Sequence, residues 1–211
     1  MIYYVIPSRR NSKGLLFKNR FLLDYTINQI SDENFKNTIV STDDEVIIDK
    51  LKDTNIKVIK RLLKLSKDDV SIKKVMLDVI DKCSMVNNDV IVLLYLVYPM
   101  RINKDIEAII SFYRKNNAKS LLCCHKVTDH PCLTFYAKDN FRGEQIIKHN
   151  AYRRQDYPEC FSLSHFVCIF KVSEIDNLNA NLYNKDTIFY PIEKPIDIDT
   201  KEDLVVLKRK E

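Results

Sequence analysis

Four positively charged side chains cluster near the start of the chain, in a polar segment that follows a short apolar run at residues 2–6. The segment contains Arg9, Arg10, Asn11, Ser12, Lys13, Gly14 and Lys18. Cationic side chains together with successive backbone N–H groups can surround a chain of phosphates. The same composition also fits a basic loop that is only solvated, and composition alone leaves both interpretations open.

Two carboxylates lie two residues apart near the other end of the chain, in the segment PIDIDT at residues 195–200. Side chains at this spacing point the same way along an extended backbone, so Asp197 and Asp199 should share one face. Mg²⁺ binds through one or two carboxylates and completes its coordination with water and phosphate oxygens. Asp199 could instead cap a final helix, and both roles stay open at this point.

Glycine is scarce, since Gly14 and Gly143 are the only two in the chain, whereas average usage would give about fifteen. A Walker A loop needs two glycines around a lysine, and a dinucleotide-binding fingerprint needs three within six residues. Both devices are therefore excluded. A bound nucleotide would have to be held in another way.

Composition also excludes several partners. The 34 basic and 29 acidic residues give a net charge of +5 without blocks of like charge, so we expect no nucleic-acid partner. The longest apolar run, at residues 90–97, is too short to cross a membrane, and we expect no membrane association. Because the N-terminal apolar residues precede the basic ones, unlike in a secretory signal, we expect a cytoplasmic protein with reduced cysteines.

A group of thiols and imidazoles near the middle of the chain does not favour zinc. It comprises Cys123, Cys124, His125, His130 and Cys132. Structural zinc sites are built from spaced pairs of the CxxC type, which this group lacks. We therefore expect no zinc site in this group.

Strands and helices should alternate through the first half of the chain. Periodicity predicts strands at residues 2–6, 38–41, 57–59, 90–97 and 120–124, and helices at 21–30, 46–51, 70–80 and 103–113. This alternation predicts right-handed βαβ units in an open, mostly parallel sheet, hence an α/β fold in a single domain over residues 1–211. Ligands of such sheets bind beyond the carboxyl ends of the strands, which directs attention to the loops after residues 6, 41 and 97.

The pattern changes after residue 125. Shorter extended pieces at residues 132–136, 166–170 and 187–191 indicate an antiparallel excursion. A last helix should begin after Asp199 or Thr200, with acidic residues in its first turn.

These motifs occur in the order found in the acylneuraminate cytidylyltransferases, which make CMP-sialic acids, and the sequence resembles this family over nearly its whole length. IPSRRNSKGLLFKN at residues 6–19 resembles the family's IPARxGSKGxPxKN, and VSTDDE at 40–45 and KPIDIDTKEDL at 194–204 follow two further family segments. Arg61, Leu65, Asp68 and Ser71 match RPxxLxxDxxS, and RRQDYP at 153–158 follows the family's RQ segment, while residues 93–106 match the family's LQPTSPLRxxxDI weakly.

The resemblance implies a Rossmann-like sheet of the nucleotide-diphosphosugar transferase type and a role in surface glycan biosynthesis. It implies that the anomeric hydroxyl of a nine-carbon α-keto acid sugar attacks the α-phosphate of CTP and releases pyrophosphate, with Mg²⁺ on Asp197 and Asp199. Charge placement dominates such transfers. The catalytic residues would be Arg9, Lys13, Lys18 and Asp199.

The resemblance also assigns binding residues by their position in the motifs. Those on the nucleotide would be Ser8, Arg9, Asn11, Ser12, Lys13, Lys18, Asn19, Arg61 and Ser71. Those on the acceptor would be Tyr95, Tyr98, Arg101, His130, Arg153, Arg154 and Gln155.

Two segments depart from the family pattern. YLVY at residues 95–98 stands where the family has Gln-Pro-Thr-Ser, and SHFVC at 164–168 stands where it has NGAIY. Sites that hydrogen-bond sugar hydroxyls discriminate strongly, so the loss of amide and hydroxyl groups bears on the acceptor. Alternative acceptors are Kdo, a legionaminic or pseudaminic acid, or an unrelated hydroxyl or phosphonate compound. A catalytically inactive nucleotide-binding relative is the third possibility, against which the intact charged residues argue.

The resemblance further implies a homodimer that forms through a subdomain at about residues 130–185. This region offers an aromatic and arginine mixture of the kind enriched in interfaces. The residues are Arg153, Arg154, Phe161, Phe166, Phe170 and Tyr183. The core of one chain could use the same aromatic residues.

Overall fold

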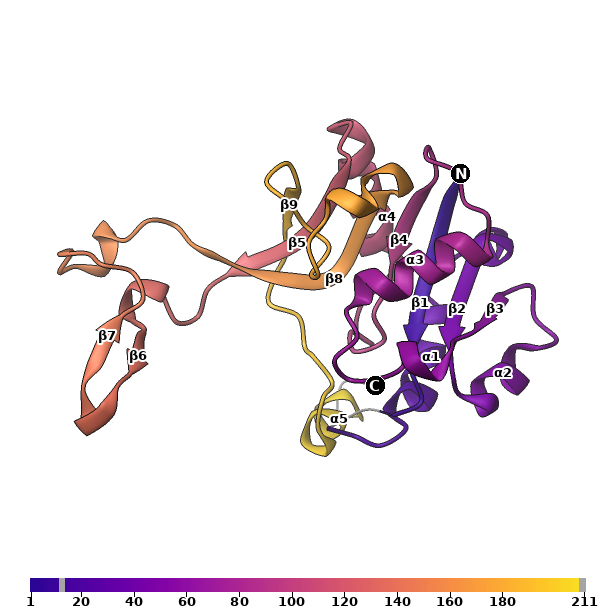
Figure 1. Cartoon of the computed structure of the whole chain (residues 1–211), viewed down its shortest axis with the longest axis horizontal. Helices are drawn as coiled ribbons and strands as arrows, with labels where there is room; N and C mark the ends of the chain where they lie inside the picture. Colours follow the sequence, from indigo (N-terminus) through magenta and orange to yellow (C-terminus); the bar gives the residue numbers. More distant parts are fainter. Residues whose placement is uncertain (12–13, 209–211) are drawn as a thin grey trace.

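A computed structural model describes residues 1–11 and 14–208. Within these residues a seven-stranded sheet runs in the order β3-β2-β1-β4-β8-β5-β9 (Figure 1). The strands are β1 (Ile2–Ser8), β2 (Thr38–Thr42), β3 (Lys57–Lys60), β4 (Val90–Leu93), β5 (Ser120–Lys126), β8 (Phe161–Lys171) and β9 (Ile188–Pro191). Neighbouring strands are parallel except where β8 pairs with β4 and β5. The predicted α/β fold with a mostly parallel sheet is confirmed.

Helices cover both faces of the sheet, which explains why its strands read as continuous apolar runs. The helices are α1 (Lys18–Ile27), α2 (Glu45–Leu51), α3 (Ile72–Lys82), α4 (Asn103–Lys115) and α5 (Lys201–Lys208). Tyr4 and Ile6 of β1 pack in one buried cluster with α1, α2 and α4, whereas Val5 packs in the other with α3. None of the helices in the described residues is long and apolar enough to cross a membrane.

Two elements predicted in the first half of the chain differ from the structure by three residues or more at one end or both. The first helix begins at Lys18, three residues earlier than predicted, because Phe17 adopts a left-handed conformation (φ 56°) that turns the loop into the helix. The strand predicted at residues 90–97 ends at Leu93. Residues beyond it stay largely buried but bond elsewhere, since the Val97 carbonyl accepts from the Ile198 amide at 2.9 Å.

The chain reverses its direction across the sheet between β1 and β4. It passes from β1 to β2 and β3 on one side, then returns to place β4 on the other side of β1. The carboxyl ends of strands at such a switch point bound a crevice that binds ligands in open α/β sheets. Residues that follow β1 and β4 are thus brought together.

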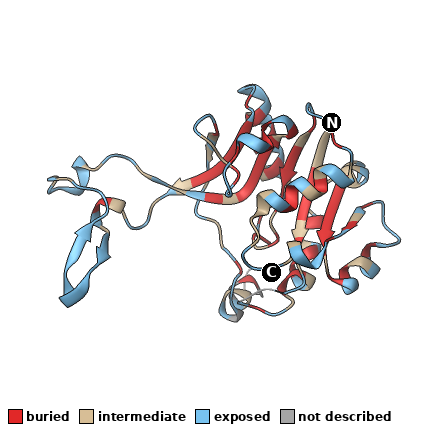
Figure 2. Cartoon of the chain, in the orientation of Figure 1, coloured by how far each residue is buried: buried red, intermediate tan, exposed pale blue. Residues whose placement is uncertain are grey.

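An arm between β5 and β8 projects from this body, at residues 127–160 (Figure 1). It carries a two-stranded antiparallel hairpin of β6 (Phe135–Ala137) and β7 (Gly143–Gln145), which confirms the predicted antiparallel excursion. Most of its residues are exposed (Figure 2). The pieces predicted at 166–170 and 187–191 belong to the main sheet instead, as parts of β8 and β9.

Candidate active site

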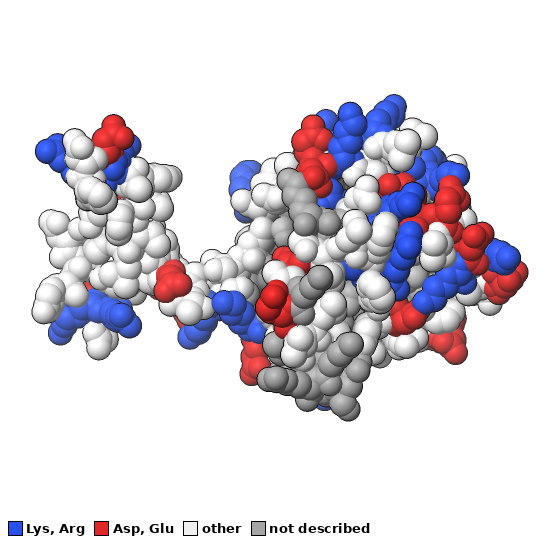
Figure 3. All heavy atoms as spheres, turned by 90° about the horizontal axis from the view of Figure 1, so that it is seen from below, with Lys and Arg blue, Asp and Glu red and all other residues white. Residues whose placement is uncertain are grey.

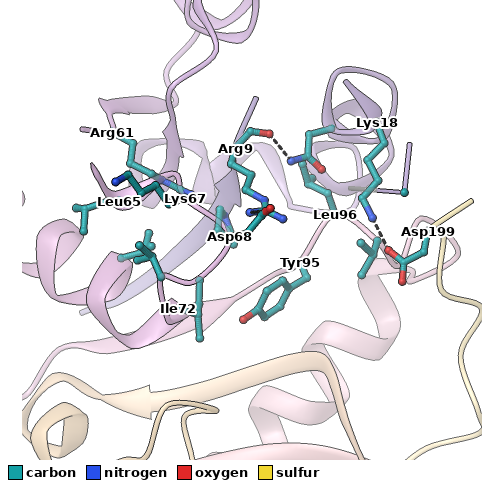
Figure 4. A pocket seen from close by; sticks show the side chains of 16 residues that line it. Arg9, Lys18, Arg61, Leu65, Lys67, Asp68, Ile72, Tyr95, Leu96 and Asp199 are labelled. Atoms are coloured by element: carbon teal, nitrogen blue, oxygen red, sulfur yellow. Dashed lines mark hydrogen bonds and ion pairs between the residues drawn. The ribbon is translucent and has the colours of Figure 1, made fainter. Parts of the chain in front are cut away.

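A cavity of about 550 Å³ opens at the carboxyl edge of the sheet, beside the ends of β1, β3 and β4 (Figure 4). Charged residues line one part of it and apolar residues another. Its lining comprises Pro7, Arg9, Gly14, Lys18, Asn19, Arg61, Leu65, Lys67, Asp68, Val70, Ile72, Val75, Tyr95, Leu96, Val97 and Asp199. The sequence motifs near both ends of the chain therefore meet here.

Lys18 joins the first turn of α1 to the segment after β9. Its side chain is largely buried, and its Nζ donates to Oδ1 of Asp199 at 2.5 Å and to the carbonyl of Ile198 at 3.1 Å. A buried ammonium is stable only when it is paired in this way. The contact brings the basic loop and the carboxylate segment into one site.

The basic loop is anchored to β2 by an aromatic and acidic framework. The centroid of the Phe17 ring lies 5.7 Å from the central guanidinium carbon of Arg10 and 4.1 Å from that of Arg20. Arg20 also binds Asp44 through two hydrogen bonds of 2.7 and 2.9 Å, and Asp43 accepts from the Arg10 amide at 2.8 Å. Cation–π contacts and bidentate pairs fix both position and orientation. The acidic residues at 43 and 44 thus position the loop.

Arg9 and Asn19 complete the charged end of the cavity. Asn19 donates from Nδ2 to the Arg9 carbonyl at 2.8 Å, which holds the loop against α1. Helix N-termini present backbone N–H groups to anions, and α1 has no side-chain cap at Phe17. The end of α1, Arg9 and Lys18 are arranged to attract a negatively charged group.

The backbone of the carboxylate segment is fixed on its buried side. Ile198 is fully buried and donates its amide to Val97, so Asp197 and Asp199 lie on the opposite, exposed side. Partial loss of hydration and the adjacent Asp199 carboxylate raise the pKa of Asp197 to about 6. The two carboxylates are therefore close enough to repel each other, although of the two only Asp199 lines the cavity.

Asp199 is free of the helix-capping role, because Thr200 and Asp203 share it. Asp203 accepts from the Thr200 amide at 2.8 Å, and its own amide donates to Thr200 Oγ1 at 3.3 Å, as in a capping box. The Asp199 carboxylate binds the Lys18 ammonium instead. A hard cation suits this pair of oxygen donors, and a cation already contacts one of them.

Metal ligands are few in the described part of the chain. No group of three or more His, Cys, Asp or Glu side chains gathers there.

Gly14 permits the close approach of the basic loop to the carboxylate segment. A Cβ atom built on this residue would overlap the carbonyl oxygen of Asp199. One of the two glycines of the chain thus stands where no side chain fits. The requirement is steric, since only a residue without a side chain leaves room for the neighbouring backbone.

The opposite side of the cavity carries Arg61 and Asp68. Arg61 donates from Nε to Ser41 Oγ at 3.2 Å and from Nη2 to the Ser41 carbonyl at 2.8 Å. Burial lowers the pKa of Arg61 to about 10, which leaves it charged at neutral pH. Arg9 reaches across to Asp68 with an Nη1 to Oδ1 distance of 2.5 Å. The two sides of the cavity are thus tied by an ion pair.

The other residues predicted to bind the nucleotide have different positions. Ser8 is fully buried at the end of β1, and its Oγ has no hydrogen-bond partner among the described residues. Asn11 is exposed on the loop, and Ser71 stands at the N-cap position of α3, between two lining residues. Ser12 and Lys13 lie outside the described residues, so their predicted roles stay predictions.

Only one of the residues predicted to bind the acceptor, Tyr95, lines this cavity. Tyr98 and Arg101 line a separate one of about 460 Å³, next to residues 190–196. Arg101 is 1% exposed and donates from Nη1 to the carbonyl of Phe166 at 2.5 Å. Burial lowers its pKa to about 10. These contacts give Arg101 a structural role in the core.

The remaining predicted acceptor residues lie on the arm. His130 and Arg154 line a third cavity, of about 630 Å³, while Arg153 pairs with Asp156 at 2.9 Å and Gln155 is exposed. A single chain does not bring them to the cavity around Lys18. Two aromatic residues predicted for an interface, Phe166 and Phe170, are buried in the core instead.

The sequence reasoning missed the apolar wall. Its four residues lie just before and within the start of α3, and Lys67 lies between the first two of them. The wall comprises Leu65, Val70, Ile72 and Val75. The wall could have been inferred from the apolar residues on either side of the predicted helix start, but such residues are equally expected in the packed core.

Comparisons with known proteins identify the family of the chain and the proteins that share its fold. A family model described as cytidylyltransferase matches residues 3–190. An N-acylneuraminate cytidylyltransferase of Streptococcus agalactiae serotype V is 24% identical over 95% of this chain. The chain spans about half the length of the curated relatives it matches, here 51%.

Solved structures share the fold. A CMP:2-keto-3-deoxy-manno-octonic acid synthetase complexed with CTP superposes with a TM-score of 0.68 at 13% identity, covering 99% of this chain and 97% of that one. A Mycobacterium tuberculosis protein, Rv0371C, in complex with manganese gives a TM-score of 0.58 at 12% identity, covering 100% of this chain and 99% of that one. From the match of the family model over most of its length, this chain belongs to the cytidylyltransferase family.

Proposed function

We propose that this protein transfers CMP from CTP to the anomeric hydroxyl of a sialic-acid-like nonulosonic sugar, with Mg²⁺, and releases pyrophosphate. The observation that carries the proposal is the meeting of Arg9, Lys18 and Asp199 in one cavity. The names of the curated relatives and the CTP in the superposed synthetase support the choice of substrates.

The charged end of the cavity suits the triphosphate. Arg9 and Lys18 would bind phosphate oxygens, while Asn19 keeps the loop carrying Arg9 in place. Positioning and fixed positive charge supply most of the rate in such transfers. The bond between the acceptor oxygen and the α-phosphorus forms as the bond to pyrophosphate breaks, and the hydroxyl proton is released.

The carboxylates would hold the metal. Asp197 and Asp199 are neighbouring carboxylates, and the ion pair of Asp199 with Lys18 supports a role for this carboxylate in binding positive charge. Mg²⁺ when bound offsets phosphate charge and lowers the pKa of a coordinated hydroxyl. Lys18 would then turn from Asp199 to the phosphates, a short movement of its flexible side chain.

The apolar wall suits the nucleoside. Leu65, Val70 and Ile72 offer flat contact surface next to the Arg61 guanidinium, which remains charged. Such sites combine mostly apolar lining with a few oriented polar groups. We place the cytidine there, with Ser71 beside it.

The acceptor could differ from a sialic acid. The superposed synthetase acts in CMP-Kdo formation by its name, and the two departures at residues 95–98 and 164–168 change polar positions. Kdo is therefore the second candidate acceptor.

We place the reaction in the cytoplasm, the compartment expected from the sequence, where cysteines such as the six of this chain stay reduced.

The arm suits pairing with a second copy of the chain. Its surface exposes large apolar side chains, and much of it is uncharged in Figure 3, where a narrow neck joins it to the body. These side chains are Leu133, Phe135, Tyr136, Phe141, Ile146, Ile147 and Tyr152. A two-stranded hairpin is marginally stable alone, so this one needs a partner surface. We propose a homodimer in which the arm brings Arg154 and His130 to the partner's acceptor.

The test is pyrophosphate release from CTP and Mg²⁺ with a panel of acceptors, and mass spectrometry of the product. The panel should contain N-acetylneuraminic acid, legionaminic and pseudaminic acids, Kdo and a phosphonate. We expect turnover with a nonulosonic acid. CTP binding without turnover on the whole panel would indicate an inactive relative instead.

A further inference from the structure

Two aromatic side chains that break the family pattern pack against each other beside the cavity. Tyr95 follows β4, and His165 lies on the neighbouring strand β8. Their ring centroids are 5.4 Å apart at an interplanar angle of 65°, which is an edge-to-face contact. Such contacts stabilise one relative orientation of the rings. The two segments that depart from the family sequence, residues 95–98 and 164–168, are therefore in direct contact and form one structural unit.

Arg101 ties the backbones of this unit together. Its Nη2 donates to the Tyr95 carbonyl at 3.1 Å, and its Nη1 donates to the carbonyl of Phe166, the residue after His165. His165 is held in turn through its Nε2 by the carbonyl of Asn181 at 3.2 Å. Burial lowers the pKa of His165, so its ring is neutral. Tyr95 thus has a fixed backbone and a fixed ring contact.

The Tyr95 side chain faces the cavity between the charged end and the apolar wall (Figure 4). Burial raises the pKa of its phenol well above the ordinary value, so the hydroxyl keeps its proton and can donate. Within the described lining there is no serine or threonine, and Tyr95 carries the only hydroxyl. Its neighbours Leu96 and Val97 offer no polar side-chain group.

The order of the strands indicates which part of the bound substrates would lie next to Tyr95. Phosphates belong at Arg9 and Lys18 after β1, and the nucleoside belongs at Arg61 after β3. In-line transfer places the attacking oxygen opposite the leaving pyrophosphate. The space left for an acceptor lies over β4 and β8, next to Tyr95. This step rests on the proposed function.

We propose that Tyr95 determines acceptor specificity, and that His165 and Arg101 are its positioning residues. The acceptor class that fits is a sugar acid that presents a deoxygenated or acylated face to Leu96 and Val97 and takes one hydrogen bond from the phenol. A face rich in hydroxyls would lose its water partners against these two side chains without replacement. Leu96 and Val97 therefore select against polyhydroxylated acceptors.

The test compares two nonulosonic acids that differ only in a terminal methyl or hydroxymethyl group. We expect the wild-type protein to favour the methyl compound by about tenfold or more in kcat/KM. Tyr95→Phe should lower kcat/KM for that acceptor by about tenfold, while the Kd for CTP stays within about twofold. Tyr3→Phe is the matched control, because Tyr3 lies at the opposite end of β1 from the site.

The positioning role of His165 has its own readout. His165→Ala should raise the acceptor KM and reduce the preference between the two compounds, and His165→Phe, which keeps a ring at this position, should restore the preference. The inference is overturned if the wild-type protein has the same kcat/KM for both acceptors, or if Tyr95→Phe leaves the kcat/KM for the methyl compound unchanged.

Calorimetric binding of both acids to the CTP-loaded protein separates this inference from the proposed function. A binding preference without pyrophosphate release contradicts only the proposed function. Turnover without a preference contradicts only the role of Tyr95. If neither acid binds, both proposals fail.

Discussion

The ammonium of Lys18 lies 2.5 Å from Oδ1 of Asp199, across 181 positions of the sequence. The pair joins the first turn of α1 to the segment that precedes α5. Under the proposed function, Lys18 would bind phosphate and Asp199 would bind a hard cation, so the ion pair joins the two charges that the substrates would separate.

Removal of the Lys18 charge should impair catalysis far more than folding. Lys18→Met keeps most of the buried aliphatic contact, and Asp199 remains largely exposed to water, so the melting temperature should change little. The loss of a cation matched to phosphate charge should lower kcat by about 100-fold. Lys50→Met removes an exposed ion pair with Asp24 and serves as the control. Equal effects of the two substitutions on kcat would contradict the assignment.

Asp199→Asn should change the metal dependence of the reaction. An amide is a poorer ligand for Mg²⁺, so the Mg²⁺ concentration for half-maximal rate should rise by about tenfold or more. The melting temperature should fall only slightly, because Thr200 and Asp203 cap α5. Asp186→Asn, on an exposed loop, is the control. A large loss of stability with an unchanged metal response would support a purely structural role.

Asp197 should make the metal-free protein less stable as pH rises. Its pKa is about 6 in the folded protein, against an ordinary value of 3.8, because of lost hydration and the Asp199 charge. The folded state therefore binds more protons than the unfolded state between about pH 4 and 6, and this group's contribution to stability declines through that window. Thermal melts in EDTA should show that Asp197→Asn is stabilising at pH 7 and neutral at pH 4. A stabilisation that is equal at both pH values would refute this.

Gly14→Ala should displace the basic loop from the carboxylate segment. The added Cβ would overlap the Asp199 carbonyl, which is backbone and cannot rotate away. We expect the Kd for CTP with Mg²⁺ to rise by about tenfold or more. Gly143→Ala is the matched control, because its Cβ would meet the Phe135 side chain on the exposed arm. If both variants have the wild-type Kd for CTP, the close approach of Gly14 to the Asp199 carbonyl does not contribute to CTP binding.

The arm should hold two chains together. Phe135→Glu places a charge on its exposed apolar surface, and light scattering should then report a monomer in place of the dimer expected for the wild-type protein. Val86→Glu, at a comparably exposed position on the body, should leave the dimer intact. A wild-type monomer with full activity would contradict the pairing.

Mixed dimers test whether the arm serves the partner's site. Inactive Arg154→Ala and Lys18→Met proteins should regain part of the activity when combined, because one site of the mixed dimer then has both residues intact. No recovery in verified mixed dimers would place the two residues in one chain's site or remove Arg154 from it.

The fold and part of the candidate site could be predicted from local patterns. The apolar run at residues 2–6 predicted a buried strand, and the spacing of Asp197 and Asp199 predicted neighbouring carboxylates, of which only Asp199 lines the cavity. The start of α1 at Lys18 could not be predicted in this way, because it follows the left-handed turn at Phe17, whose ring contacts Arg10 and Arg20.

Contacts between distant parts of the chain also determine features that hydrophobic periodicity does not reveal. Arg101 matches a motif position, yet its guanidinium binds carbonyls in the core, a partner choice that no local pattern encodes. The antiparallel insertion of β8 between β4 and β5 joins segments far apart in sequence. It placed Phe166 and Phe170 in the core, although their composition also fitted an interface.

The fate of the α-phosphorus tests the central claim most directly. CTP labelled with ³²P at the α-position is incubated with Mg²⁺, the protein and the acceptor, and the products are separated. The account predicts that the label enters a CMP-acceptor conjugate, that CTP labelled at the γ-position yields labelled pyrophosphate, and that Lys18→Met abolishes most of both. Label that remains in CTP with every acceptor, or that appears only as free CMP or inorganic phosphate, would contradict it.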